Sequence, residues 1–132
     1  MKTIGIDTNV LLTLRLQREP QFKQVKKLFE LCLDGKQKIF LPVVVLLEVE
    51  WVMRSVYKQS KEQVIEFFEE LLAIDDLLLD DKAEVIQSVN LYKESPNVSF
   101  TDCVIINEVN NKNYDFLTFD KALEKLYISL KD

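Results

Sequence analysis

The order of apolar and polar residues predicts short strands that alternate with helices along the whole chain. Short apolar runs predict strands, and apolar residues that recur every three or four positions predict helices. The predicted strands are Thr3–Ile6, Lys38–Leu41, Asp75–Leu79, Asp115–Phe119 and Tyr127–Leu130. The predicted helices are 8–14, 21–33, 43–57, 60–73, 81–94, 99–111 and a short one that starts at Asp120. This alternation predicts an α/β fold, a parallel sheet with helices on both faces.

Local signals mark where several of these elements begin and end. Asp34 and Gly35 are typical of a helix end, and Ser60 with Gln63 forms a capping box at a helix start. The segment 43–57 is ambiguous, because its valines favour a strand whereas its length and lack of turn residues favour a helix. We predict a helix that begins at Pro42. Since no linker or repeat interrupts the pattern, we expect one domain spanning 1–132.

The amino-acid composition excludes several kinds of catalytic site. The chain has no histidine, which excludes Ser-His-Asp and Cys-His catalysis, and its two glycines exclude a glycine-rich phosphate loop. Cys32 and Cys103 form neither a disulfide framework nor a C-x-x-C motif. No apolar stretch is long enough for a membrane helix or a secretory signal, so we expect a cytoplasmic protein. The remaining catalytic tools are carboxylates, hydroxyls and a metal.

Charge is unevenly distributed along the chain. The net charge is −5, yet residues 15–38 hold seven Lys or Arg against three acids. This segment has two interpretations: a solvated helix face, or a basic surface for phosphates. The second interpretation makes basic residues of this segment candidate contacts to the phosphates of a ligand, in particular Arg15, Arg18, Lys23, Lys26 and Lys27.

Three aspartates occupy positions where a ligand site of a parallel sheet is expected. Asp7 and Asp120 directly follow predicted strands, and Asp102 lies in the first turn of a predicted helix. Ligands of open parallel sheets bind at the carboxyl ends of the strands. Each residue also has a structural interpretation, because Asp7 and Asp120 could be N-caps and Asp102 could complete a capping box with Ser99. Taken singly, these aspartates leave both interpretations open.

Glu48 is harder to explain as a structural residue. It lies inside a predicted helix, among the apolar residues Val44, Val45, Trp51 and Val52, and no basic residue stands three or four positions away. A carboxylate on an apolar face is costly unless a proton or a metal neutralises it. Four carboxylates in one pocket would repel one another, and Mg²⁺ or Mn²⁺ would relieve that repulsion because these ions prefer carboxylate oxygens.

Four segments together resemble the PIN-domain ribonucleases, in particular the VapC-type toxins of toxin–antitoxin pairs. They are IGIDTNVLL, LPVVVLLEVEWVMR, VSFTDCVI and FLTFDKAL, and their order spans nearly the whole chain. The resemblance implies a PIN-like parallel sheet of about five strands and a Mg²⁺- or Mn²⁺-dependent endoribonuclease. It assigns the catalytic and metal-binding roles to Asp7, Glu48, Asp102 and Asp120, with Asn9 and Thr118 supporting the pocket. It also implies an RNA substrate, with tRNA as one candidate, a cognate antitoxin and a homodimer.

Two other functions are compatible with the predicted fold. The first is a non-catalytic PIN-fold module that binds RNA or protein. The second is a phosphate-accepting signalling domain, which requires a pair of acids beside the first strand. Asp7 is followed by Thr8 and Asn9, with no second acid, so the sequence disfavours the signalling domain.

Overall fold

A computed structural model describes residues 2–131 and divides the chain into two compact units. The first unit is Met1–Lys82 and the second is Ala83–Asp132. Each unit has its own internal contacts, and each is described below by itself. Among residues 2–131, no helix combines the length and apolar character that crossing a membrane requires.

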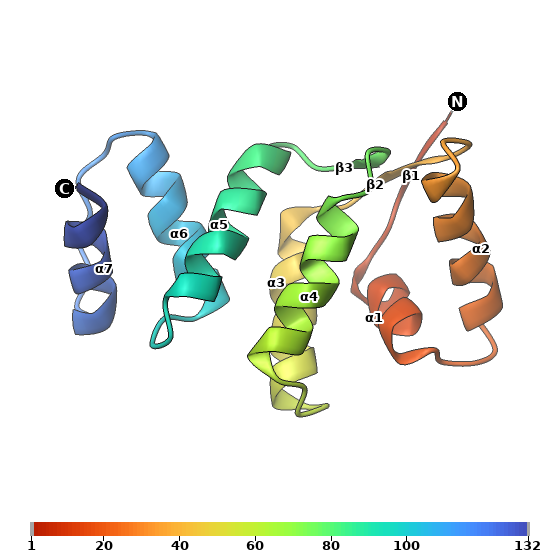
Figure 1. The fold of residues 1–132 in the computed structure, drawn as a ribbon, viewed down its shortest axis with the longest axis horizontal. Helices are drawn as coiled ribbons and strands as arrows, with labels where there is room; N and C mark the ends of the chain where they lie inside the picture. Colours follow the sequence, from red (N-terminus) through yellow and green to blue (C-terminus); the bar gives the residue numbers. More distant parts are fainter. Residues whose placement is uncertain (1, 132) are drawn as a thin grey trace. The chain divides into compact units, whose positions relative to one another are not determined.

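The first unit contains a parallel sheet of three strands. Its strands are β1 (Thr3–Gly5), β2 (Lys38–Phe40) and β3 (Leu77–Leu78), in the order β1-β2-β3 (Figure 1). Ile39, at the centre, pairs with Ile4 on one side and with Leu77 on the other. Two helices join each strand to the next, because a parallel connection must return the chain to the starting end of the sheet.

The first unit has four helices, two in each connection between strands. They are α1 (Thr8–Leu16), α2 (Phe22–Leu33), α3 (Val43–Ser55) and α4 (Lys61–Leu72). Helix α1 packs on α2 and α3, and α3 packs on α4. Within β2, Ile39 is fully buried, whereas its neighbours Lys38 and Phe40 are exposed and half-buried, respectively. The core is formed by apolar side chains that include Leu11, Ile39, Leu41, Leu46, Val64 and Phe68.

Helix ends in the first unit follow their sequence signals. The Ser60 side chain accepts a hydrogen bond from the Gln63 backbone, and the Gln63 side chain accepts one from the Ser60 backbone, which confirms the capping box. Helix α2 ends at Gly35, whose φ of 73° suits glycine because it has no Cβ. The Lys36 backbone N–H then donates to the Leu31 carbonyl and closes a Schellman motif. Helix α3 confirms the helical interpretation of residues 43–57.

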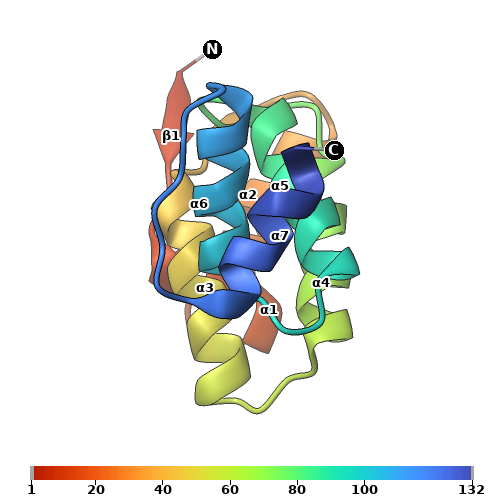
Figure 2. The same cartoon turned by 90° about the vertical axis from the view of Figure 1, so that its left-hand side faces the viewer.

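The second unit contains helices α6 (Phe100–Asn111) and α7 (Lys121–Lys131) and nearly all of α5 (Lys82–Glu94). Figure 2 shows α6 and α7 side by side, in agreement with their contacts. Helices α5 and α6 are joined by the rings of Tyr92 and Phe100, whose centroids are 5.4 Å apart. The buried Asn107 side chain adds hydrogen bonds from α6 to three groups of α5.

The structure corrects two predicted strands and confirms the α/β class. Residues 115–119 form no strand, and Leu117 and Phe119 are 83% and 94% exposed. Residues 127–130 belong to α7, where Leu123, Tyr127 and Leu130 recur at helical spacing. Each of these apolar runs was too short to distinguish a strand from other structures. The sheet therefore has three strands in the described residues, instead of the expected five.

Candidate active site

Asp7 caps α1, as one interpretation of the sequence expected. It directly follows β1, and its Oδ1 accepts a hydrogen bond of 3.1 Å from the Val10 backbone N–H. The side chain is exposed. A carboxylate has two oxygens with about four lone-pair positions, so one capping bond leaves most of its acceptor capacity free. The cap also limits how the carboxylate can turn. Asp7 can therefore be a cap and a ligand at the same time.

Glu48 lies at the middle of α3 on an exposed apolar face. Its neighbours Val44 and Trp51, one helical turn away on either side, are 54% and 63% exposed. The apolar neighbours expected from the sequence are present, and Glu48 itself is exposed. Its position inside the helix excludes a capping role. Glu48 therefore differs from an ordinary surface acid, because its accessible carboxylate is surrounded by exposed apolar side chains.

Asp102 and Asp120 begin the two last helices of the second unit. The Asp102 backbone N–H donates to Ser99 Oγ at 3.1 Å. Within residues 2–131, the Asp102 carboxylate accepts no hydrogen bond from the Ser99 backbone N–H. Only half of the predicted capping box is therefore formed. Asp120 Oδ1 accepts from the Leu123 backbone at 3.0 Å, and Thr118 Oγ1 accepts from the Asp120 backbone at 3.1 Å. Thr118 thus orients the main chain of Asp120 rather than its carboxylate.

The four acids are divided equally between the two units. Asp7 and Glu48 belong to the first unit, and Asp102 and Asp120 belong to the second. Neither unit by itself, over residues 2–131, brings together three or more acidic or cysteine side chains that could hold a metal. The meeting of all four carboxylates therefore stays a prediction. As donors, the four supply only carboxylate oxygens, which suit a hard divalent cation such as Mg²⁺ or Mn²⁺.

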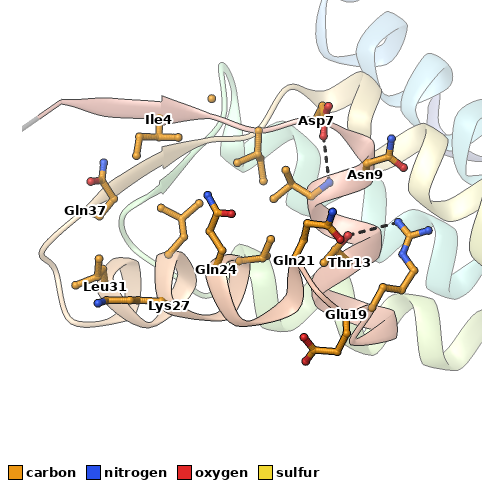
Figure 3. Close-up of a pocket in the computed structure, with 16 residues that line it drawn as sticks. Ile4, Asp7, Asn9, Thr13, Glu19, Gln21, Gln24, Lys27, Leu31 and Gln37 are labelled. Atoms are coloured by element: carbon orange, nitrogen blue, oxygen red, sulfur yellow. Dashed lines mark hydrogen bonds between the residues drawn. The ribbon is translucent and has the colours of Figure 1, made fainter.

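A cavity of about 910 Å³ opens beside Asp7 within the first unit. It lies between β1, α1 and α2, with Asp7 and Asn9 at one end and Gln37 at the other (Figure 3). The amide of Gln24 stands in the space between α2 and the strands. Its apolar lining comes from Ile4, Ile6, Val10, Val25, Leu28 and Leu31.

Three glutamines of this cavity were not among the residues selected from the sequence. They are Gln21, Gln24 and Gln37. The first two are three positions apart on α2 and share a helical face with Leu28 and Leu31. The sequence could have identified Gln21 and Gln24 by this spacing, because it places their amides on the side of the helix that also carries Leu28 and Leu31. Gln37 directly precedes β2, and it reaches the cavity only because β2 pairs with β1 in this register. The sequence alone does not give that pairing.

The structure separates the basic residues that the sequence grouped as RNA contacts. Arg18 and Lys27 line the cavity beside Asp7, whereas Lys23 and Lys26 are exposed on α2 outside its lining. Arg15 faces elsewhere. Its Nε donates to Gln59 Oε1 at 3.2 Å, and its guanidinium carbon lies 5.4 Å from the centre of the Phe67 ring. The Arg15 side chain therefore helps to pack α1 against α4.

Cys32 is a buried thiol with an altered proton affinity. Burial, and after it the negative charge of Asp76, raises the pKa of the Cys32 thiol above its usual range. A raised pKa keeps the thiol protonated near neutral pH, and the protonated form is a poor nucleophile. This agrees with chemistry that depends on carboxylates.

Comparisons with known proteins identify the family of this chain. The sequence pattern of the PIN domain matches residues 4–128, which include all four acids and both units. The chain is also similar to a VapC ribonuclease of Aquifex aeolicus (strain VF5). The two are 25% identical over 99 residues, which are 75% of this chain and 73% of that protein. Because the family pattern covers nearly the whole chain, this protein belongs to the PIN-domain family.

Proposed function

We propose that this protein is a metal-dependent endoribonuclease and the toxin subunit of a toxin–antitoxin pair. Its similarity to a VapC ribonuclease supports the reaction class. The observation that carries the proposal is the state of the four acids, Asp7, Glu48, Asp102 and Asp120. Within residues 2–131, none of them has an ion-pair partner. Carboxylates that no basic side chain neutralises are available to a divalent cation.

The four carboxylates would hold Mg²⁺ or Mn²⁺. When bound, such an ion supplies an activated water and stabilises charge on the phosphate under attack. The role of the chain is to orient the ligands. The Val10 backbone N–H restrains Asp7, and the Leu123 backbone N–H restrains Asp120. Thr118 fixes the main chain at Asp120, and Asn9 lies beside Asp7 at the cavity.

The substrate and partners follow from the resemblance to VapC-type toxins. We propose RNA as the substrate, with tRNA as one candidate, and a cognate antitoxin as the inhibitor. Arg18 and Lys27 support an RNA substrate because they add positive charge to the lining of the cavity that opens beside Asp7. Val44 and Trp51 on α3 offer exposed apolar surface to a second copy in a homodimer. A single PIN-like domain spanning 1–132 and a cytoplasmic location stay predictions.

The test compares two neighbouring acids of α3 in the purified protein. Glu48→Gln should abolish cleavage of a single-stranded RNA in Mn²⁺, whereas Glu50→Gln should retain it. Asp102→Asn should behave like Glu48→Gln. Equal cleavage by all variants would refute the assignment of the site.

A thermal measurement distinguishes the enzyme from a non-catalytic module. An ion that binds only the folded state raises apparent stability, by about 2.7 kcal/mol at a hundred times its dissociation constant. We expect Mn²⁺ to raise the melting temperature of the wild-type protein and to have a smaller effect on Glu48→Gln. A melting temperature independent of Mn²⁺ would favour the module that only binds RNA or protein.

A further inference from the structure

We propose that the cavity between β1, α1 and α2 binds one nucleotide of single-stranded RNA beside the bond that is cut. The inference rests on the proposed function only in placing the scissile phosphate near Asp7. The cavity itself belongs wholly to the first unit, and its lining comes from residues 4–37. Its volume of about 910 Å³ falls within the range of sites that enclose small organic molecules.

The apolar walls of the cavity suit the faces of a base. Ile4 points from β1 toward α2 (Figure 3), and Val25 and Leu28 line the cavity from α2. Proteins that extract a base from its stack hold it between aromatic or apolar side chains. Such walls favour any base over water, but they do not distinguish one base from another.

The glutamines of the cavity can read the edge of a base. Within residues 2–131, the side chains of Gln21 and Gln24 have no hydrogen bond to another part of the protein. Gln37 uses its Nε2 to donate to the Lys2 and Lys38 carbonyls at 2.6 and 2.9 Å, which leaves its Oε1 facing outward as an acceptor. A glutamine amide offers a donor and an acceptor side by side, the combination that pairs with the edge of a base.

Positive charge at the same cavity suits the phosphate that accompanies the base. Arg18 and Lys27 both line it, and an Arg18 Nη donates to Thr13 Oγ1 at 3.5 Å, which restrains the guanidinium. A restrained guanidinium can contact a phosphate or stack on a base. Glu19 also lines the cavity, and Figure 3 shows its carboxylate directed away from β1. The lining therefore combines two cations with two carboxylates, Asp7 and Glu19, of which Glu19 turns away from β1.

The same residues favour RNA over a protein segment as the occupant. A partner helix that covered the cavity with apolar side chains would bury the amides of Gln21 and Gln24 without hydrogen bonds. Burial of unsatisfied amides is costly, whereas a base satisfies them. The two cations likewise require an anionic partner, which every nucleotide provides.

The first experiment uses the full-length protein and a random-sequence RNA library in Mn²⁺, with sequencing of the cut ends. The wild-type protein should prefer a base at one position next to the cut. Gln24→Leu retains side-chain bulk but removes the amide, so this preference should fall roughly tenfold, as loss of a bidentate contact implies. The Mn²⁺-dependent rise in melting temperature should persist, because Gln24 is not among the proposed metal ligands. An unchanged base preference in Gln24→Leu would overturn the inference.

A second pair of variants tests the phosphate contact. Lys27→Ala should weaken RNA binding equally for all sequences and make it less dependent on salt. Lys125→Ala, which removes the same charge from exposed α7, should change neither property. If the two variants behave alike, the cavity has no specific phosphate contact and the inference fails.

Crosslinking without metal separates this inference from the proposed function. RNA that carries photoreactive 4-thiouridine should crosslink to α2 near Gln24 in EDTA, and Gln24→Leu should reduce the yield. Crosslinking without any cleavage in Mn²⁺ would refute the nuclease and retain the subsite. Cleavage in Mn²⁺ without crosslinks at α2 would refute the subsite and retain the nuclease. Protection of α2 by an uncharged amphipathic peptide and not by RNA would show a protein-docking groove and overturn the subsite.

Discussion

Two substitutions at Asp7 separate its role as a helix cap from its proposed role as a metal ligand. Asp7→Asn keeps an oxygen that can accept from the Val10 N–H, which lies 3.1 Å away, but removes the negative charge. Asp7→Ala removes both. Asparagine caps about as well as aspartate, so Asp7→Asn should change the free energy of unfolding by at most about 0.5 kcal/mol in EDTA. Asp7→Ala should lose about 1 kcal/mol, or about 3 to 5 °C in melting temperature.

The response to Mn²⁺ should not distinguish the two variants, because both remove the charge of the carboxylate. Each tenfold loss of affinity for a saturating ion removes about 1.4 kcal/mol of its stabilisation. Asp7→Asn and Asp7→Ala should therefore lose similar amounts of the Mn²⁺-induced shift in melting temperature, although only the alanine variant is destabilised without metal. Calorimetry in EDTA measures the stability without metal, and calorimetry in Mn²⁺ measures the shift in melting temperature. An RNA cleavage assay measures the activity of each variant. Full cleavage and a full Mn²⁺ response in Asp7→Asn would refute the site, and equal destabilisation by both variants in EDTA would refute the cap.

Two further predictions concern stability. Asn107 Nδ2 lies 3.1 to 3.3 Å from acceptors on Glu84, Gln87 and Ser88, and two good bonds of about 1 kcal/mol each imply that Asn107→Ala costs about 2 kcal/mol in urea unfolding. The exposed Asn111, with one bond to Gln87, is the control, and an equal cost of Asn111→Ala would contradict the network. The raised pKa of Cys32 means that the folded state keeps a proton that the unfolded state releases. Its contribution to stability should be complete below about pH 8.5 and decline as pH rises toward the folded pKa. Urea midpoints should therefore fall more at alkaline pH in the wild-type protein than in Cys32→Ala, and parallel pH profiles would contradict this assignment.

Sequence alone determined the features of this protein that depend on near neighbours in the chain. The capping box of Ser60 and Gln63, the end of α2 at Gly35 and the helix after Pro42 are all confirmed, because each depends on residues within one or two helical turns. The capping bonds of Asp7 and Asp120 are local in the same way. The family was also readable, since its four motifs follow one another in order and the PIN-domain match covers them.

Tertiary structure decided the features that depend on partners distant in the chain. Residues 115–119 have the composition of a strand, but a strand exists only where another strand offers its backbone, and here none pairs with them in the described residues. Arg15 and Arg18 are three positions apart in the sequence, yet contact with Phe67 occupies the first, while the second lines the cavity beside Asp7. Glu48 lies on an apolar face, as its neighbours implied, but α3 leaves that face exposed. Periodicity fixes which residues share a face, whereas only the packing of other elements determines what that face meets.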